Sequence, residues 1–241
     1  MNQKNYGRVL IKLSGEMLMG QESYGIDTPT LDRMSQDVAQ VVAAGYQVGI
    51  VIGGGNIFRG VAGAAQGLDR ASSDYMGMLA TCINGLALQN ALERQNIQTR
   101  LLTAIKMDEV AEPYLRRRAI RHMEKGRIVL FVAGTGNPFF TTDTAAALRA
   151  VELNCNLMLK ATKVDGIYTA DPEKDSQAEH IPELTYQETI VNNLKVMDGT
   201  ALTLCRDNNL PIMVASMMHE GGLLRALEGE AKATLVTNES C

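Results

Sequence analysis

The sequence predicts an α/β protein with a mainly parallel central sheet. Short and almost wholly apolar runs at 8–13, 48–52 and 128–133 are typical of strands that are buried on both faces. Segments with apolar residues at helical spacing lie between these runs, as parallel strands require, because each parallel pair needs a crossover connection. The 241 residues are 46% hydrophobic, which suffices for one large domain or two small ones. A soft change of composition near Thr142 suggests two lobes that share one sheet.

The first three elements form a predicted βαβ unit. Asp27 and Pro29 are typical of a helix start, and Gly45 is typical of a helix end. Between them the apolar residues fall at helical spacing: Leu31, Met34, Val38 and Val41. The strands 8–13 and 48–52 flank this helix, so we expect a parallel pair with a right-handed crossover.

Three consecutive glycines, Gly53–Gly55, follow the second strand. We expect them to turn at positive φ and to bring backbone N–H groups against a ligand, since no Cβ stands in the way. Asn56 adds an amide and Arg59 adds a guanidinium group. The loop therefore predicts an anion site, most simply for phosphate. The alternative is a tight turn between strand and helix that binds nothing.

The middle of the chain predicts one long helix and one basic helix. After a loop over 61–73, Asp74 is expected to open a helix that continues to about Gln95, either as its N-cap or as a carboxylate that binds sugar hydroxyls. A strand over 100–105 precedes a helix over 108–125 that Pro113 interrupts. Basic side chains gather in this last segment, which indicates a solvated helix face, a site for an anionic effector or a subunit contact: Arg116, Arg117, Arg118, Arg121, His122, Lys125 and Arg127.

A second loop rich in glycine and hydroxyl groups follows the strand 128–133. Residues 134–143 combine these groups with two aromatic rings and end in Asp143, at the start of a helix over 145–153. Such a loop has the parts that hold a planar base and a phosphate group. The remaining predicted elements are a strand at 157–159, a surface loop over 171–182, a helix over 198–207, a strand over 211–215, a short helix after Gly221–Gly222 and a strand over 234–237.

Two lysines stand where buried strands end. Lys12 precedes the small loop Ser14–Gly15, and Lys160 follows the strand 157–159. Each lysine could extend along the edge of the sheet to solvent. However, open parallel sheets bind ligands at the carboxyl ends of their strands. We therefore expect Lys12, Arg59 and Lys160 to face one crevice, together with the amides of the glycine loops.

Such a concentration of positive charge suits phosphoryl transfer between two polyanions, which depends mostly on positioning and charge stabilisation. A phosphate acceptor, with a second pKa near 6, would be mostly ionised at pH 7 and would need no general base. Asp143 could hold the lysines in place or approach Mg²⁺ through water, without direct metal ligation by side chains. The three histidines, His122, His180 and His219, lie outside every glycine or lysine loop named above.

Composition and motifs exclude several other classes. The net charge of −4 argues against general nucleic-acid binding, which requires a basic surface. The four cysteines have no CxxC spacing, so neither a disulfide framework nor a zinc site is expected. With no secretory or membrane-spanning segment in the sequence, we expect a cytoplasmic protein. A P-loop motif is absent, and Phe139 stands where a dinucleotide-binding motif requires its third glycine.

Several motifs, taken together and in order over about residues 8–237, resemble the bacterial uridylate kinases of the amino acid kinase superfamily. The residues that carry this resemblance are Lys12–Glu16, Gly53–Gly60, Asp74 with Met76–Thr81, Thr135–Asp143 and Ala161–Gly166. The resemblance implies a three-layer αβα sandwich in a single domain over 1–241, with a UMP lobe over 1–142 and an ATP lobe over 143–241. It also implies ATP-dependent conversion of UMP to UDP with Mg²⁺, a homohexamer, activation by GTP and inhibition by UTP.

The resemblance assigns roles to residues of this sequence. Lys12, Lys160, Asp143 and Arg59 would be catalytic, with the two lysines sharing the transferred phosphate. The ATP phosphates would contact Lys12, Leu13, Ser14, Gly15, Gly55 and Arg59, and the adenosine part would contact Thr162, Tyr168 and Asp171. UMP would be held by Gly54, by Asp74 on the ribose, and by Thr135, Gly136, Asn137, Pro138, Phe139, Phe140, Thr141 and Thr142. The GTP-responsive segment would be Gly20, Gln21, Glu22, Ser23, Tyr24 and Gly25.

The sequence departs from the family pattern at three places. Asn156 replaces an acidic residue that often precedes this strand, the segment 106–127 is unusually rich in arginine, and Tyr24 stands where phenylalanine is common. We expect the first two departures to bear on effector response or subunit packing. Two other functions stay open: a family member that phosphorylates a carboxylate such as acetylglutamate or aspartate, and a protein that binds an oxoanion or nucleotide without turnover.

Overall fold

The computed structural model describes residues 6–59, 67–170, 172, 174–175 and 177–239. A nine-stranded sheet runs through it in the order β4-β3-β5-β2-β1-β6-β10-β11-β9, and all neighbouring strands are parallel except β10 and β11. The strands are β1 (Arg8–Leu13), β2 (Gln47–Ile52), β3 (Thr99–Thr103), β4 (Glu112–Pro113), β5 (Ile128–Val132), β6 (Leu157–Thr162), β9 (Glu183–Thr185), β10 (Ile212–Ser216) and β11 (Ala233–Thr237). A separate antiparallel pair joins β7 (Ile167–Tyr168) to β8 (His180–Ile181).

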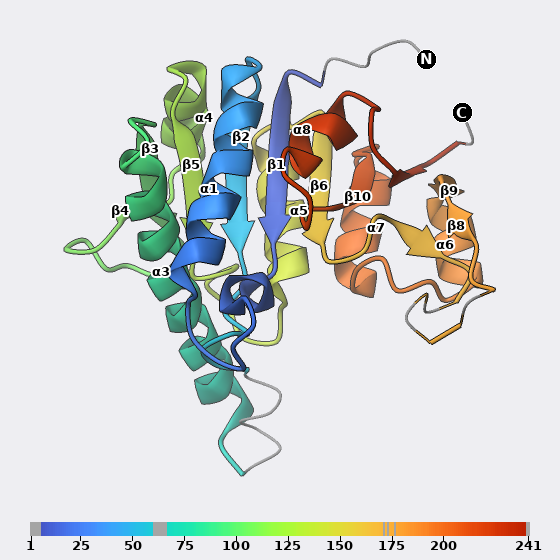
Figure 1. Ribbon diagram of the computed structural model, residues 1–241. Coiled ribbons are helices and arrows are strands. Elements are labelled where there is room, and N and C mark those ends of the chain that lie inside the picture. Colours follow the sequence, from blue (N-terminus) through green and yellow to red (C-terminus); the bar gives the residue numbers. More distant parts are fainter. Residues whose placement is uncertain (1–5, 60–66, 171, 173, 176, 240–241) are drawn as a thin grey trace.

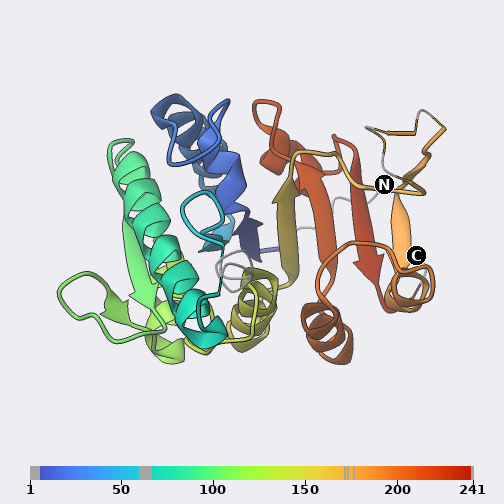
Figure 2. The same ribbon diagram turned by 90° about the horizontal axis from the view of Figure 1, so that it is seen from below.

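Helices cover both faces of the sheet, as Figures 1 and 2 show. One face packs against η1 (Gly15–Met19), α1 (Thr28–Ala43), α3 (Arg70–Glu93) and α8 (Gly222–Leu227). The other packs against α4 (Arg116–Glu124), α5 (Thr142–Glu152), α6 (Tyr186–Val191) and α7 (Gly199–Asp207). Because side chains alternate along a strand, Val9 and Ile11 enter the first core whereas Leu10 enters the second. The predicted three-layer α/β/α sandwich is confirmed.

The first βαβ unit forms as the sequence predicts. Asp27 accepts a hydrogen bond from the Thr30 amide at 2.9 Å and so caps α1. The four apolar residues at helical spacing in α1 are all buried against the sheet. β1 and β2 then pair in parallel register from Arg8 with Gln47 to Leu13 with Ile52.

The prediction that Asp74 opens the long helix is wrong. The helix α3 begins at Arg70, and its N-cap is Asp69, whose side chain accepts from the Ser72 amide at 2.8 Å. Asp74 therefore lies inside the second turn, where its carboxylate is free from capping. Of the loop predicted over 61–73, residues 70–73 belong to the helix, and 61–66 lie outside the described residues.

The predicted helix over 108–125 is wrong in its first half. Glu112–Pro113 forms β4, which pairs with the end of β3, and α4 begins only at Arg116. Proline has no backbone N–H and disfavours helical geometry in the residue before it, which accounts for the extended segment. The short elements η1, β7, β8, β9 and α6 were not predicted, because runs of two to six residues carry too little periodicity to be seen.

Three cysteines, Cys82, Cys155 and Cys205, are free and buried, as expected for thiols in an apolar core; Cys241 lies outside the described residues. No helix in the described part of the chain has both the length and the apolar character to span a membrane. The division into a UMP lobe and an ATP lobe at residues 142 and 143 stays a prediction.

Candidate functional site

The candidate site lies at the carboxyl ends of the central strands, which form the lower edge of the sheet in Figure 1. β1 is hydrogen-bonded to β2 on one side and to β6 on the other. In this register Lys12 stands directly beside Lys160, although the two are far apart in the sequence. The parallel arrangement therefore brings two lysines together at one edge, as predicted.

Both lysines converge on the carboxylate of Asp143. The Nζ atom of Lys12 lies 2.7 Å from Oδ1, and the Nζ atom of Lys160 lies 3.0 Å from Oδ2. The three side chains are 11%, 19% and 14% exposed, in the order Lys12, Lys160, Asp143. The Lys160 ammonium also donates to the backbone carbonyl of Val196 at 2.5 Å. One carboxylate thus holds two ammonium groups, which leaves a net positive charge at the edge of the sheet.

Burial and charge act in opposite directions on this cluster. Burial alone would raise the pKa of Asp143, but the charges and hydrogen bonds of the two lysines outweigh it and lower that pKa below its usual value. Burial, together with repulsion by Lys12, lowers the pKa of Lys160, although the carboxylates of Asp143 and Asp198 oppose this change. An ammonium group that is largely shielded from water and still has an N–H to donate is suited to binding an anion.

The helix α5 places Asp143 at this position. Thr141 is its N-cap, and the threonine hydroxyl accepts from the amides of Asp143 at 3.1 Å and Thr144 at 3.2 Å. Asp143 therefore lies in the first turn, where a negative side chain is favoured by the helix dipole. Because the loop 134–141 leads directly into this turn, the loop and the lysine pair are connected through the backbone.

The glycine loop after β2 packs closely on the turn after β1. The amide of Gly53 donates to the carbonyl of Leu13 at 2.9 Å, and a Cβ added at Gly15 would lie 2.6 Å from the carbonyl oxygen of Gly53. A Cβ at Gly54 would lie 2.7 Å from the carbonyl oxygen of Gly77 in α3. The expectation of positive φ at Gly53–Gly55 is wrong, since none of the three adopts it. Gly53 and Gly54 allow close backbone approach instead, since a Cβ at Gly53 would lie 3.0 Å from the Gly15 amide nitrogen, whereas a Cβ at Gly55 would meet nothing closer than 3.6 Å.

Asn56 does not present its amide to the cavity, contrary to the sequence interpretation. Its side chain is buried and forms a reciprocal pair with Asn84 of α3, at 3.0 and 2.7 Å, while its Nδ2 also donates to the carbonyl of Gly25 at 2.8 Å. Asn84 in turn donates to the carbonyl of Gly53 at 2.7 Å. This amide pair fixes the glycine loop to α3 and to the segment 20–25.

A cavity of about 200 Å³ opens between the glycine loop, the start of α3 and the loop after β5. Most of the residues predicted to hold UMP line it, and they meet Arg59 and Gly55 there: Gly54, Asp74, Thr135, Asn137, Phe140, Thr141 and Thr142. Gly136, Pro138 and Phe139 belong to the same loop but do not line this cavity. Thr142 borders Asp143, so the cavity ends next to the lysine pair.

Arg59 lies at the exposed mouth of this cavity and not beside the lysines. Its guanidinium group pairs with Glu16 of η1, and both side chains are largely exposed. The Nε atom also donates to the carbonyl of Gly55 at 3.4 Å. As predicted, Lys12, Arg59 and Lys160 all lie at the carboxyl edge of the sheet. Of these three residues, however, only the two lysines share a partner, Asp143.

Asp74 connects α3 with the loop after β5. Its carboxylate accepts from Arg70 Nε at 2.9 and 3.0 Å and from the amide of Phe139 at 2.8 Å. The Arg70 guanidinium lies 5.6 Å from the centroid of the Phe139 ring. Phe139 has φ +70° and is 69% exposed, so a large apolar ring is held in solvent in a conformation that such residues rarely adopt. Strain of this kind occurs most often at ligand sites.

The residues predicted for adenosine lie at the end of β6 and in the β7–β8 pair. The hydroxyl of Thr162 donates to the carbonyl of Val164 at 2.5 Å. The Tyr168 hydroxyl donates to Asp165 at 2.5 Å, and this bond, with burial and the Asp165 charge, raises the pKa of Tyr168 to about 12. The ring of His180 packs edge-on against Tyr168 at 5.3 Å. Asp171 lies outside the described residues.

Comparison with known proteins identifies the family. The profile of the amino acid kinase family matches residues 7–216. A protein of Hyphomonas neptunium named uridylate kinase is 56% identical over 238 residues, which are 99% of this chain and 95% of the relative. The chain belongs to the amino acid kinase family, in its uridylate kinase group.

Solved structures of uridylate kinases agree with the fold. The crystal structure of the UMP kinase from Ureaplasma parvum matches with a TM-score of 0.91 at 39% identity, covering 95% of this chain and 98% of that one. The structure of the UMP kinase from Bacillus anthracis matches with a TM-score of 0.93 at 39% identity, covering 98% and 97%. The family resemblance inferred from the motifs is therefore confirmed.

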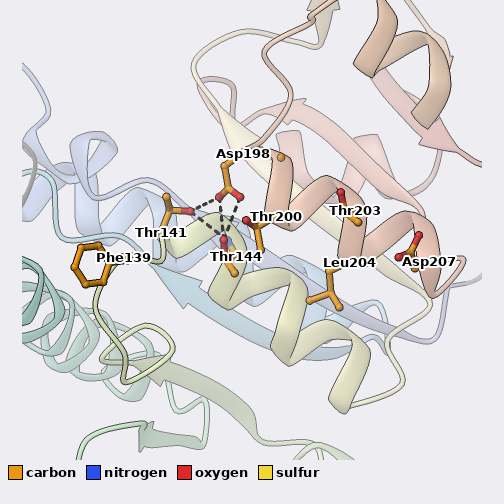
Figure 3. Close-up of a pocket in the computed structure, with 9 residues that line it drawn as sticks. Phe139, Thr141, Thr144, Asp198, Thr200, Thr203, Leu204 and Asp207 are labelled. Atoms are coloured by element: carbon orange, nitrogen blue, oxygen red, sulfur yellow. Dashed lines mark hydrogen bonds between the residues drawn. The ribbon is translucent and has the colours of Figure 1, made fainter. Parts of the chain in front are cut away.

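The structure gives roles to three residues to which the sequence analysis assigned none. Glu16, at the end of the first motif, pairs with Arg59, and Arg70 pairs with Asp74 one turn later in α3. Asp198 is the third: it appeared in the sequence only as the start of a helix. Its carboxylate accepts hydrogen bonds from the hydroxyls of Thr141 and Thr144, next to an open groove of about 840 Å³ (Figure 3).

The basic helix and Asn156 lie away from the lysine pair. In α4, Ala119 and Met123 are buried. The Nη1 atom of Arg118 and the Nε2 atom of His122 each lie 3.5 Å from Oε2 of Glu112. This arrangement fits a solvated face, and the effector and subunit roles stay open. Asn156 joins the amino ends of β1 and β6. Its side-chain Oδ1 accepts from the backbone amide of Arg8 at 3.2 Å, and its backbone amide donates to the Arg8 carbonyl at 2.8 Å.

Proposed function

We propose that this chain transfers the γ-phosphoryl group of ATP to UMP and releases UDP and ADP. The observation that carries the proposal is the placement of Lys12 and Lys160 on one buried carboxylate, at the start of the helix that follows the loop 134–141. Two cations at one point suit the charge of a phosphoryl group in transfer. The names of the similar proteins, uridylate kinase and UMP kinase, support UMP as the acceptor.

In this mechanism the two lysines stabilise charge, and Asp143 positions the lysines. In phosphoryl transfer, charge spreads over the oxygens of the transferred group while the attacking and leaving oxygens stay in line. Preorganised ammonium groups from β1 and β6 stabilise this charge from fixed positions without reorganising. Asp143 contributes by holding both ammonium groups at hydrogen-bonding distance, so that neither lysine must be ordered when the nucleotides bind.

The acceptor needs no general base in this site. A phosphate with a second pKa near 6 is mostly dianionic at pH 7, so its oxygen can attack directly. Among the described residues that line the cavity there is no histidine. His122 instead contacts Glu112, and His180 packs against Tyr168.

UMP would bind in the cavity between the glycine loop and the loop after β5. Asp74 stands at its wall and would bind the ribose hydroxyls, and Gly54 would also contact UMP. Gly55 and Arg59, which line the mouth of the same cavity, would contact the phosphates of ATP. ATP would bind on the other side of the lysine pair, where β6 ends and Thr162 and Tyr168 lie. The two nucleotides would then meet at Lys12 and Lys160.

Mg²⁺ would accompany ATP. In the part of the chain that the structure describes, no three histidine, cysteine or acidic side chains gather as a metal-binding group. Both oxygens of Asp143 already contact ammonium groups. Mg²⁺ commonly keeps several waters and binds nucleotide phosphates, which this arrangement allows, with Asp143 as the carboxylate that could reach the ion through water. The ion would add charge stabilisation for the phosphates.

We further propose that the chain assembles with copies of itself, as a hexamer. Apolar side chains on one stripe of α3 are exposed in the single chain, at helical spacing: Met76, Leu79, Ile83 and Leu86. An apolar stripe of this kind is stabilised when a second surface covers it. Light scattering of the purified protein measures the mass, and a monomer at micromolar concentration would contradict the proposal.

GTP activation and UTP inhibition complete the proposed function. The segment 20–25 is joined to the glycine loop, since the amide of Gly25 donates to the Asn56 carbonyl at 2.9 Å and Asn56 donates back to Gly25. A ligand that moves this segment would therefore move the loop. Initial rates with and without each nucleotide test both effects, and unchanged rates would remove the regulatory part alone. A cytoplasmic location also stays a prediction.

A coupled assay of ADP release tests the enzymatic proposal. UMP, CMP and AMP are compared as acceptors at equal concentration, with acetylglutamate and aspartate in parallel. We expect UMP to give the highest kcat/KM by a wide margin. Equal rates with all three nucleotides would contradict the acceptor, turnover of an amino acid would assign another kinase of the family, and binding of nucleotide without ADP release would indicate a binding protein.

A further inference from the structure

We propose that Asp198 is a positioning residue for phosphoryl transfer: its carboxylate orients the Thr141 hydroxyl, and that hydroxyl sets the first turn of α5 from which Asp143 holds the two lysines. Asp198 touches neither lysine, and it lies outside the cavity assigned to UMP. The inference rests on the proposed kinase function and adds to it a residue that acts through others.

The hydrogen bonds around Thr141 give Asp198 this role. The Thr141 hydroxyl donates its only hydrogen to Oδ2 of Asp198. Its lone pairs are then left to accept from the amides of Asp143 and Thr144, at 3.1 and 3.2 Å. A hydroxyl that donated elsewhere would turn its lone pairs away from α5. The carboxylate therefore selects the one rotor orientation that caps the helix.

A second hydroxyl strengthens the same connection. Thr144, three residues after Thr141 in the first turn of α5, is buried, and its Oγ1 lies 3.1 Å from both oxygens of Asp198. Figure 3 shows both threonines, one just before α5 and one in its first turn, directed toward Asp198. Asp198 also caps its own helix, α7, by accepting from the Ala201 amide at 2.9 Å. One carboxylate thus ties the starts of two helices together.

The segment that carries Asp198 also holds Lys160. Val196, two residues earlier, is buried, and its carbonyl accepts from the Lys160 ammonium at 2.5 Å. The residues 196–198 therefore contact the lysine through a carbonyl and the helix of Asp143 through a carboxylate. Moving this segment away from α5 would separate Lys160 from Asp143, and a small displacement of reacting groups is known to cost about a hundredfold in rate.

The substitution Asp198→Asn tests this inference in the full chain. Asparagine caps a helix as well as aspartate does, so we expect the melting temperature to stay close to that of the parent. Its amide has one accepting oxygen and an NH₂ group that donates toward Thr141, so the hydroxyl loses its orientation. We expect kcat to fall about tenfold or more, with KM for UMP and ATP within about twofold, because positioning is lost and not binding. Asp207→Asn, in the same helix and beside the same groove, is the control and should keep the parent kcat.

A second pair of variants shows whether Asp198 acts through Thr141. In a Thr141→Val background the hydroxyl is absent, so adding Asp198→Asn should lower kcat by less than about twofold further. Thr144→Val leaves the cap of α7 intact and should lower kcat less than Asp198→Asn does. If Asp198→Asn does not fold, Thr144→Val still tests the inference. An unchanged kcat in Asp198→Asn, or a full additional loss in the Thr141→Val background, would overturn the inference. Absence of UMP-dependent ADP release in the parent would instead contradict the proposed function.

Discussion

The lysine pair and the mouth of the cavity hold charge in opposite ways. At the pair, Lys12, Lys160 and Asp143 are mostly buried and are carried by two strands and the first turn of a helix. At the mouth, Arg59 pairs with Glu16, and Arg70 pairs with Asp74 at the start of α3. The two arginines are 58% and 42% exposed, whereas Asp74 is 11% exposed. The first region is fixed by the sheet, and the second depends on arginines that water reaches.

This difference assigns different kinetic tasks to the two regions. Charges shielded from water interact strongly with a phosphate, and strands keep them in place during the reaction. Exposed ion pairs contribute little to stability and can exchange one partner for a ligand at small cost. We therefore expect changes at the lysine pair to lower kcat, and changes at the mouth to raise KM for one nucleotide.

The largest expected effect comes from Lys12→Ala. Loss of one preorganised charge in the transition state should lower kcat by about a hundredfold or more, with little change in fold. Lys12→Met, which keeps most of the buried stem, should give a similar loss and separates charge from packing. Steady-state kinetics measures both, and Lys232→Ala, at an exposed lysine, is the control. A kcat within threefold of the parent would break the comparison at its stronger side.

Asp143→Asn tests how the pair is held. Removing a carboxylate from between two buried ammonium groups should lower the free energy of unfolding by about 3 kcal/mol and kcat by about tenfold or more. The pKa of Asp143 is lowered in the folded state, so its contribution is present above the unfolded pKa, about 3.9, and is lost as pH falls through the folded value. Urea unfolding between pH 2 and pH 7 should show this loss in the parent and not in the variant.

The matched control for that experiment is Asp108→Asn. Asp108 pairs with Lys106 at 3.4 Å, and both side chains are mostly exposed. We expect less than about 0.5 kcal/mol from its removal, as for other exposed pairs. If the two variants lost equal stability, burial would not distinguish the lysine pair from the surface.

At the mouth, Asp74→Asn should raise KM for UMP about tenfold and change KM for ATP much less. The carboxylate accepts hydrogen bonds that would include the ribose hydroxyls, and bonds to charged groups contribute about 1.5–3 kcal/mol. Initial rates with each nucleotide varied in turn measure both constants. Asp69→Asn, at the N-cap of the same helix, should leave both unchanged, since asparagine caps equally well. Equal increases for UMP and ATP would contradict a ribose role.

The smallest effect is expected from Tyr168→Phe. This change removes the hydroxyl that donates to Asp165 and leaves the ring that packs on His180. KM for ATP should rise by about two- to fivefold, with kcat and KM for UMP unchanged, because one neutral donor is lost. Tyr46→Phe, at the amino end of β2, is the control. A larger effect on UMP than on ATP would place Tyr168 on the wrong side of the lysine pair.

Much of the fold could be predicted because its signals are local. Buried parallel strands appear as apolar runs, and α1 shows both its cap and its apolar spacing within a few residues. The lysine pair was predictable in kind, since parallel strands end at one edge. That Lys12 stands directly beside Lys160 depends on the strand order, in which β1 lies next to β6, and no local pattern gives this order.

The hydrogen-bond partner of each polar side chain could not be predicted from the sequence. Asp69 and Asp74 are equally plausible caps for α3, and the choice depends on where the preceding chain turns. Asn56 looked free for a ligand, but its partner Asn84 lies in a helix that reaches the loop only in the folded state. In the sequence, Asp198 cannot be told from an ordinary N-cap residue. Its hydrogen bonds to Thr144 form only because α5 packs on α7 in the folded chain.

A crystal structure with UMP and a non-hydrolysable ATP analogue tests the central claim most directly. The distances to be measured join the γ-phosphate oxygens to the Nζ atoms of Lys12 and Lys160. We predict that both lie within about 3.2 Å, with the UMP phosphate in line on the side of the glycine loop. A γ-phosphate that contacts neither lysine, in a complex with both nucleotides bound, would contradict the assignment of the pair to phosphoryl transfer.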